Sequence, residues 1–149
     1  MEKAEVLVLC THNSARSQMA EGFLRKYASD HFEVYSAGLE PTEVHPYAKR
    51  VMAEAGVDIS DQYSKSVLDF LGKVHFGYVM TVCSKAEQEC PIFPDVSVRL
   101  HWPFPDPAAA TGSEEEQLAA FREVRDRIDE RIQAWLKELS DGAGTLRAS

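Results

Sequence analysis

The feature that most constrains the fold is a strand-like run that passes, across one short polar loop, into a helical pattern. Residues 4–9 (AEVLVL) form a short apolar run that is typical of a buried strand. The apolar residues that follow recur at helical spacing: Met19, Ala20, Phe23, Leu24 and Tyr27. A buried strand followed by a helix is the repeating unit of a parallel sheet, so this pattern predicts an α/β fold.

The rest of the chain continues the alternation of strands and helices. Further strands are predicted over residues 32–38, 76–82 and 98–102. Helices are predicted from Pro46 to Met52 with Gly56 as the stop, over residues 66–71, and from 113–116 onward to Leu139. We therefore expect an α/β three-layer sandwich, in which a small parallel sheet of about four strands has helices on both faces.

Length and charge limit the organisation and the partners. A chain of 149 residues suits one catalytic domain, predicted over residues 1–140, with a small polar tail over 141–149 that we expect to be flexible. A formal net charge of −8 argues against nucleic-acid binding and favours a monomer. Neither an apolar run of membrane-spanning length nor a charged-then-apolar leader is seen, so we expect no membrane partner and a cytoplasmic location.

The loop after the first strand carries the clearest chemical signal. It reads CTHNSARS over residues 10–17: a cysteine, five residues, an arginine and a hydroxyl. A loop of this length between a strand and a helix can direct its backbone N–H groups at one anion, and the helix N-terminus adds positive charge. The predicted oxyanion-binding loop consists of Thr11, His12, Asn13, Ser14, Ala15 and Arg16.

Within this loop each residue type has a chemical reason to be present. Cys10 would lie at the bottom as a thiolate nucleophile, with its pKa lowered from about 8.5 to between about 3.5 and 7.5. Arg16 would grip two oxygens of a tetrahedral oxyanion, and Ser17 could donate its hydroxyl to the thiolate. Asn13 tolerates the positive φ of a tight turn. The alternative is that Cys10 merely ends a buried strand and Arg16 is an exposed residue at the helix start.

Two more cysteines, Cys83 and Cys90, lie seven positions apart. Six intervening residues exceed the usual zinc spacing, so we expect no metal. If residues 84–90 are helical, the two Cα atoms are separated by about 10.5 Å, whereas a disulfide needs roughly 7 Å or less. These cysteines could therefore bridge only after that helix unwinds. The alternative is two buried thiols that act as small hydrophobic residues.

An aspartate between two prolines follows the fourth predicted strand, in the segment from His101 to Pro107. Prolines on both sides of Asp106 stiffen its loop, which suits a general acid that must point into a site. The alternative is an ordinary turn aspartate, but the oxyanion loop earlier in the chain favours the acid.

These motifs together resemble a known family across nearly the whole chain. The cysteine, five residues, arginine and serine after the first strand resemble the phosphate loop of low-molecular-weight protein tyrosine phosphatases. The continuation QMAEG over residues 18–22 resembles more closely the thioredoxin-coupled arsenate reductases built on that fold, since the phosphatases usually place proline at Gln18. His12 departs from the pattern, because several reductases carry glycine there.

The resemblance implies reduction of arsenate to arsenite by a three-cysteine relay. Cys10 would attack arsenic, Arg16 would bind the oxyanion and Asp106 would protonate the leaving hydroxide. Cys83 and Cys90 match the intermediate and final redox cysteines, with thioredoxin, or less favourably glutaredoxin, as the reductant. No cofactor is implied. Two alternatives stay open: a phosphatase that needs only Cys10, Arg16 and Asp106, and a non-catalytic oxyanion or redox sensor.

The resemblance also suggests a cation site beside the loop. Asn13, Glu21 and Ser36 match positions that bind potassium in some of these reductases, where the fourth ligand is acidic. This chain has Lys65 there, and its ammonium group could replace the ion. The alternative is that Lys65 is a solvated surface residue.

Overall fold

The computed structural model describes residues 3–89 and 98–141, and it contains one four-stranded parallel sheet. The strands are β1 (Ala4–Cys10), β2 (Phe32–Gly38), β3 (Tyr78–Thr81) and β4 (Val98–His101), in the order β2-β1-β3-β4. Because all pairs are parallel, the carboxyl ends of the strands meet at one edge. This arrangement confirms the predicted fold class.

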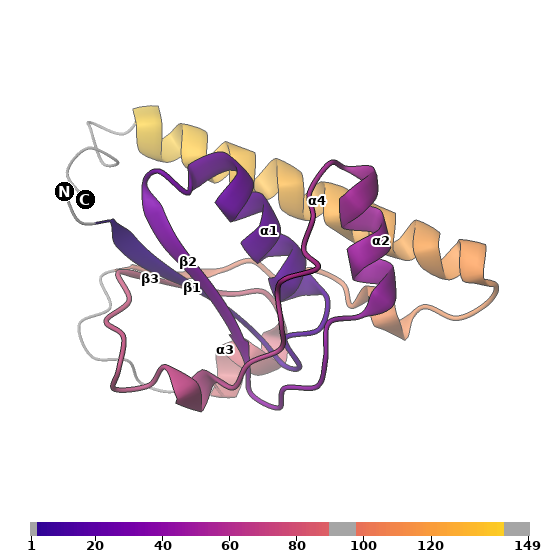
Figure 1. The fold of residues 1–149 in the computed structure, drawn as a ribbon, viewed down its shortest axis with the longest axis horizontal. Coiled ribbons are helices and arrows are strands. Elements are labelled where there is room, and N and C mark those ends of the chain that lie inside the picture. Colours follow the sequence, from indigo (N-terminus) through magenta and orange to yellow (C-terminus); the bar gives the residue numbers. More distant parts are fainter. Residues whose placement is uncertain (1–2, 90–97, 142–149) are drawn as a thin grey trace.

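Three helices pack together on one face of the sheet: α1 (Arg16–Ala28), α2 (Pro46–Glu54) and α4 (Glu114–Asp141). The short helix α3 (Ser84–Glu89) and the 3₁₀ turn η1 (Val67–Asp69) lie on the other side in Figure 1, and a second 3₁₀ turn, η2 (Pro107–Ala109), contacts α4. None of the described helices is long and apolar enough to cross a membrane.

The predicted elements differ from the observed ones mainly at their ends. The helix expected over residues 66–71 is only the turn η1, which Ser66 and Asp69 cap at its start. Helix α4 begins with the predicted capping box, in which the Ser113 hydroxyl accepts from the Glu116 N–H, 3.1 Å. It continues through Asp141, one residue past the predicted domain boundary. The predicted tail beyond it, residues 142–149, lies outside the described residues.

The core is continuous between the sheet and the helical face. The central strand β1 is buried from Val6 to Cys10, and the apolar residues of α4 lie against α1 and α2. The buried residues of α4 are those predicted from its periodicity: Leu118, Phe121, Val124, Ile128, Ile132 and Trp135. Tyr27, predicted on the apolar face of α1, is instead 37% exposed, and its hydroxyl hydrogen-bonds to Asp129.

The start of α2 makes the fold sensitive to acid. The Nδ1 atom of His45 accepts the Tyr47 N–H at 3.0 Å and caps the helix, while the ring lies 4.7 Å from that of Phe121. Burial lowers the pKa of His45 below 6.5, although Asp106 acts in the opposite direction. Below about pH 6.5 the unfolded chain therefore binds more protons than the folded protein, so the free energy of unfolding should fall as pH falls. A protonated ring also loses the capping acceptor.

This prediction can be checked by urea unfolding of the wild-type protein and His45→Asn at about pH 7.5 and about pH 5.5. Asparagine can still cap the helix but does not titrate. We expect the wild type to lose more stability than His45→Asn over this range. Equal losses would show that His45 does not set the acid sensitivity.

Candidate active site

The predicted oxyanion loop lies at the carboxyl edge of the sheet. Cys10 is the last residue of β1, and α1 begins at Arg16, so the loop occupies the turn between them. Asn13 has a φ of 52°, the only positive value at a non-glycine residue in the described chain. The prediction that Asn13 holds the tight turn is confirmed.

The carbonyl groups of this loop are all bonded to the surrounding protein. Backbone N–H groups within residues 39–45 donate to the carbonyl oxygens of Cys10, Thr11, His12 and Ser14. The Gln18 side chain donates to the carbonyl oxygen of Asn13, and the Met19 N–H donates to that of Ala15. All six donor–acceptor distances are 2.8–3.2 Å. Because these carbonyls are held in bonds to the scaffold, the loop can present its N–H groups to an anion instead.

Two residues that the sequence analysis did not single out support this geometry. A side-chain carbon added to Gly38 would lie 2.8 Å from Asn13 N and Thr11 O, so only glycine fits beneath the loop. The buried Gln18 amide donates to Asn13 O at 2.9 Å and to Tyr63 O at 3.0 Å. In the sequence Gln18 differs from the proline usual in the phosphatases, but this difference does not indicate the two hydrogen bonds.

Arg16 and Asp106 meet across the mouth of the loop. Arg16 Nη2 lies 3.9 Å from Asp106 Oδ2, and Nη1 donates to the Phe104 carbonyl at 3.1 Å. The second oxygen of Asp106 accepts the Ala108 N–H and caps η2. A cavity of about 50 Å³ is lined by Cys10, His12, Ser14, Ala15, Arg16, Asp106 and Ala108, which suits one small molecule. The structure thus brings the predicted nucleophile, guanidinium and acid to one cavity.

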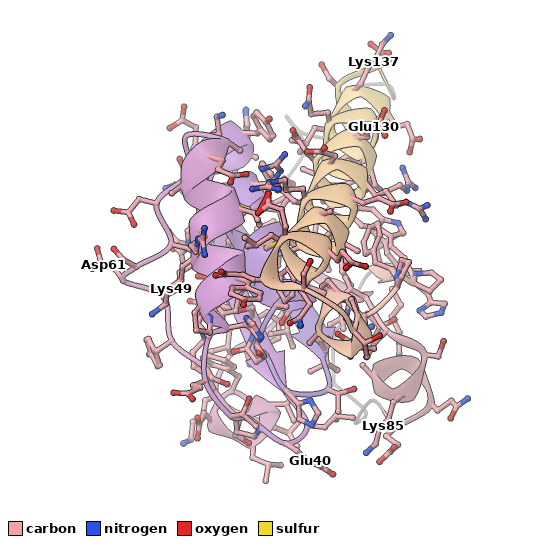
Figure 2. All side chains as sticks on the ribbon, turned by 90° about the vertical axis from the view of Figure 1, so that its right-hand side faces the viewer. Glu40, Lys49, Asp61, Lys85, Glu130 and Lys137 are labelled. Atoms are coloured by element: carbon pink, nitrogen blue, oxygen red, sulfur yellow. The ribbon has the colours of Figure 1, made fainter. Side chains whose placement is uncertain are left out.

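His12 lies at the rim of this cavity, with a side chain that is about half exposed. Its Nε2 atom is 4.0 Å from Glu40, and Glu40 is 3.4 Å from Lys85 at the start of α3. Figure 2 shows Glu40 and Lys85 at the same end of the molecule. Through Glu40, the His12 side chain of the oxyanion loop is therefore linked to Lys85, two residues after Cys83.

Cys83 lies directly beside Cys10. It follows β3, which pairs with β1, and the preceding Val82 N–H donates to the Leu9 carbonyl at 3.0 Å. The Thr11 hydroxyl is 3.2 Å from the Cys83 sulfur, and the Ala86 N–H donates to the same sulfur at 3.4 Å. Both cysteines are free and buried. Cys90 lies outside the described residues, although α3 covers the predicted helical stretch up to Glu89.

The pair of thiols corrects the expected ionisation of Cys10. The hydrogen bond with Cys83 and burial raise the pKa of Cys10, against the lowering effect of Arg16 and the Thr11 N–H. The pKa of Cys83 is lowered to about 5, first by the Cys10 hydrogen bond and then by the Thr11 hydroxyl and Ala86 N–H. The physical reason is that the two sulfurs share one proton and one negative charge. The thiolate therefore belongs to the Cys10–Cys83 pair rather than to Cys10 alone.

The four residues of the predicted cation site form one connected network. Asn13 Nδ2 donates to Ser36 Oγ at 2.9 Å, and Ser36 donates to Glu21. Lys65 Nζ is 3.7 Å from Glu21 and donates to the Tyr63 carbonyl at 2.6 Å, while its N–H donates to Asn13 Oδ1. The Lys65 side chain is only 9% exposed, so it is not a solvated surface residue. Burial lowers the pKa of Lys65, and Glu21 opposes this effect.

Ser17 is buried next to the same network. Its hydroxyl accepts from Asn13 Nδ2 at 2.8 Å, which ties the first turn of α1 to the oxyanion loop. Donation from this hydroxyl to the Cys10 thiolate stays a prediction.

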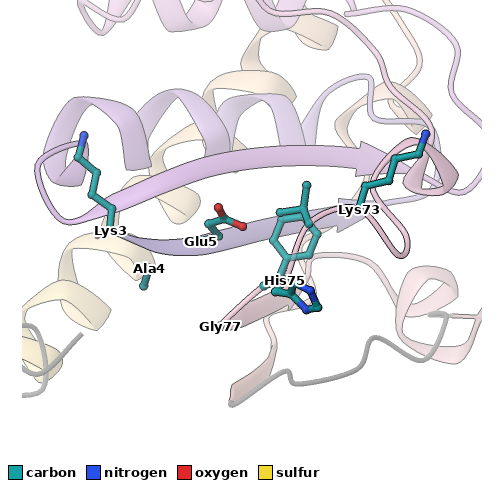
Figure 3. Close-up of a pocket in the computed structure, with 8 residues that line it drawn as sticks. Lys3, Ala4, Glu5, Lys73, His75 and Gly77 are labelled. Carbon is teal, nitrogen blue, oxygen red and sulfur yellow. The ribbon is translucent and has the colours of Figure 1, made fainter. Parts of the chain in front are cut away.

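A hollow of about 500 Å³ borders the cation network, and Glu21 and Lys65 are among the residues that line it. Another, of about 440 Å³, is formed at the opposite edge of the sheet by residues that include Lys3, Glu5, Lys73 and His75 (Figure 3). Within residues 3–89 and 98–141, no group of three or more His, Cys, Asp or Glu side chains is placed to hold a metal ion.

Comparisons with known proteins agree with this geometry. Residues 5–143 match the family model described as low molecular weight phosphotyrosine protein phosphatase. An arsenate reductase of Halalkalibacterium halodurans is 46% identical over 136 residues, which cover 91% of this chain and 96% of the relative. A solved arsenate reductase in the phosphate-binding state superposes with a TM-score of 0.77 at 32% identity, covering 91% of this chain and 98% of that one. A thioredoxin-dependent arsenate reductase of Corynebacterium glutamicum gives 0.69 at 30% identity, covering 93% of this chain and 62% of that one.

Proposed function

This chain belongs to the low molecular weight phosphotyrosine protein phosphatase family, and we propose that it is an arsenate reductase that works by a relay of three cysteines. The observation that carries the proposal is the position of Cys83: it directly follows the strand that pairs with β1, and its sulfur lies 3.2 Å from the hydroxyl of Thr11, the residue after Cys10. A phosphatase of this fold needs only Cys10, Arg16 and Asp106, and has no use for a second thiol beside its nucleophile. Relatives named arsenate reductase support the same assignment.

The first step binds arsenate and joins it to Cys10. Arg16 and the loop N–H groups hold the oxyanion. As arsenate enters, Cys83 takes the shared proton, so that the Cys10 thiolate can attack arsenic. The arsenic–oxygen bond breaks, and Asp106 gives a proton to the departing hydroxide. In this step the Cys10–Cys83 pair acts as nucleophile and base.

The second step transfers the oxidation to the two cysteines. Cys83 attacks the Cys10 sulfur, a disulfide forms, and the sulfur–arsenic bond breaks with its electron pair left on arsenic. Arsenic is thereby reduced by two electrons and leaves as arsenite, which takes up the Cys83 proton. Because Cys83 directly follows the strand that pairs with β1 and lies against Thr11, this step needs little movement.

The third step requires a conformational change. Cys90 attacks Cys83, frees Cys10 and moves the disulfide to the Cys83–Cys90 pair. Helix α3 lies between these cysteines along the chain, and an intact helix would hold their Cα atoms about 10.5 Å apart, so α3 must unwind. We propose that thioredoxin then reduces the exposed disulfide, in a cytoplasmic monomer whose thiols are otherwise kept reduced.

A coupled assay with thioredoxin, thioredoxin reductase and NADPH tests this proposal. We expect NADPH oxidation only when arsenate is present, and its loss in Cys90→Ser. Replacing thioredoxin by glutaredoxin and glutathione should restore little of the rate. Arsenate-independent oxidation, or full activity in Cys90→Ser, would overturn the relay.

The phosphatase alternative is weakened at the cavity wall. Ala108, Ala109 and Ala110 follow the Asp106-Pro107 pair, and Ala108 lines the cavity itself. Small side chains leave no aromatic wall against which a phosphotyrosine ring could stack. The sensor alternative lacks an equivalent observation, since Cys10 lines a cavity that an acid and a guanidinium also line.

We also propose that Lys65 is a built-in cation that replaces bound potassium. Its ammonium group is 3.7 Å from the buried Glu21 carboxylate, which connects through Ser36 to Asn13 of the loop. The wild-type rate should therefore not respond to potassium at constant ionic strength. Lys65→Asp should lose on the order of tenfold in kcat/KM and regain part of it with potassium chloride but not with tetramethylammonium chloride. Strong activation of the wild type by potassium would contradict this role.

A further inference from the structure

The thiol pair offers chemistry beyond arsenate. Cys10 lines the 50 Å³ cavity, and Cys83 does not, so a molecule that enters from solvent meets Cys10 first. Behind it the Cys83 sulfur lies 3.2 Å from the hydroxyl of Thr11, the residue that follows Cys10, at the end of the paired strand β3. A nucleophilic thiol with a second thiol in contact is the arrangement of a reversible oxidation site.

We propose that this site also reduces hydroperoxides, with Cys10 as the thiol that is oxidised and Cys83 as the thiol that resolves the product. Cys83 takes the proton that the pair shares, the Cys10 thiolate attacks one peroxide oxygen, the O–O bond breaks, and the leaving oxygen takes a proton from Asp106. Cys10 is then a sulfenic acid and the peroxide has gained two electrons. Only the later recycling of the enzyme rests on the arsenate relay proposed above.

The second step is the same substitution as in arsenate reduction. Cys83 attacks the Cys10 sulfur, the disulfide forms and the sulfur–oxygen bond breaks. The displaced hydroxide takes the Cys83 proton and leaves as water. One peroxide and two thiols thus give one alcohol or water, a second water and one disulfide.

The site fits this reaction because both substrates release the same kind of leaving group. Arsenate and hydrogen peroxide each lose a hydroxide from the atom that Cys10 attacks, so an acid placed for one reaction is placed for the other. Asp106 is tied to this position by its bond to the Ala108 N–H and by Arg16 at 3.9 Å. A cavity of about 50 Å³ also admits a two-oxygen molecule, whose share of space is close to that of two waters.

Cys83 also decides whether the oxidation is reversible. A sulfenic acid that meets a second peroxide becomes a sulfinic acid, which thioredoxin does not repair. Since Cys83 lies beside Cys10 before any reaction, disulfide formation competes well with that second encounter.

Mass spectrometry of protein treated with hydrogen peroxide alone tests the proposal. In Cys90→Ser we expect a Cys10–Cys83 disulfide, and in Cys83→Ser a Cys10 carrying two added oxygens. Asp106→Asn should slow the loss of the Cys10 thiol by on the order of 10²-fold. Phosphate should protect Cys10, because it occupies the same cavity. Equal over-oxidation of Cys10 with and without Cys83, or no Cys10–Cys83 disulfide, would overturn the inference.

A second arm separates this inference from the proposed function. With thioredoxin, thioredoxin reductase and NADPH, hydrogen peroxide should drive NADPH oxidation faster with the wild type than with Cys10→Ser, which gives the background of thioredoxin itself. Turnover with peroxide but not with arsenate would contradict the arsenate reductase proposal only. Turnover with arsenate and a rate with peroxide equal to that background would contradict the peroxide inference only.

Discussion

Cys83→Ser should lose arsenate-dependent NADPH oxidation by on the order of 10³-fold or more, while its hydrolysis of an aryl phosphate is retained or raised. The loss follows because no thiol then remains beside Cys10 to displace arsenite from its sulfur. Hydrolysis needs only Cys10, Arg16 and Asp106, all of which stay at the cavity. Moreover, the Cys83 hydrogen bond is the largest cause that raises the pKa of Cys10, so its removal favours the Cys10 thiolate.

The measurement pairs the coupled NADPH assay with p-nitrophenyl phosphate hydrolysis on the same preparations. Cys10→Ser is the control, since it should lose both activities. A pH profile of hydrolysis should show its acidic limb at lower pH in Cys83→Ser than in the wild type, because the Cys10 pKa is lower without the paired thiol. Arsenate turnover that survives in Cys83→Ser would contradict the relay, and loss of hydrolysis would show that Cys83 supports the loop itself.

The second large effect is expected at a glycine rather than at a reactive group. Gly38→Ala would place a carbon 2.8–2.9 Å from three backbone atoms of the oxyanion loop, belonging to Thr11, His12 and Asn13. Because these atoms are backbone, the loop itself must shift. Overpacking of this kind costs about 1–3 kcal/mol in the free energy of unfolding. It should also disturb the N–H groups that face the anion, so phosphate affinity should fall by on the order of 10²-fold.

The matched control is Gly77→Ala at the start of β3. An added carbon there meets its nearest atom, the Glu5 carbonyl oxygen, at 3.8 Å, which is ordinary contact. Urea unfolding gives the stability of each variant, and calorimetric titration with phosphate gives the affinity. We expect Gly77→Ala to bind phosphate as the wild type does. Equal effects of the two substitutions would show that Gly38 is not the support of the loop.

The sequence predicted most of the fold because its signals are local. The apolar run before Cys10 and the periodicity of residues 118–139 gave β1 and α4 nearly to their ends. The turn at Asn13 was predicted from a residue type that tolerates positive φ. Tyr27 and the short turn η1 were misjudged because a hydrogen-bond partner on α4 and a cap by Asp69 depend on tertiary contacts and on side-chain bonds.

The site was predictable in its residues but not in its electrostatics. The motif around Cys10 and the acid loop indicated which groups react, and the structure brings Cys10, Arg16 and Asp106 together. Placing the negative charge requires the position of Cys83, which is 73 residues from Cys10 in the chain yet lies beside the end of β1 in the fold. For the same reason Gly38 and Gln18 carried no clear signal, since their role is to contact a loop that the fold brings near.

The central claim is that one arsenate oxidises Cys83 and Cys90 and leaves Cys10 reduced. It is tested most directly by mixing reduced protein with one equivalent of arsenate, without thioredoxin, and mapping disulfides by mass spectrometry after acid quenching. We predict one arsenite released per protein, a Cys83–Cys90 disulfide in the wild type and a Cys10–Cys83 disulfide in Cys90→Ser. Arsenite release without these disulfides, or a protein that stays fully reduced with arsenate unchanged, would contradict the account.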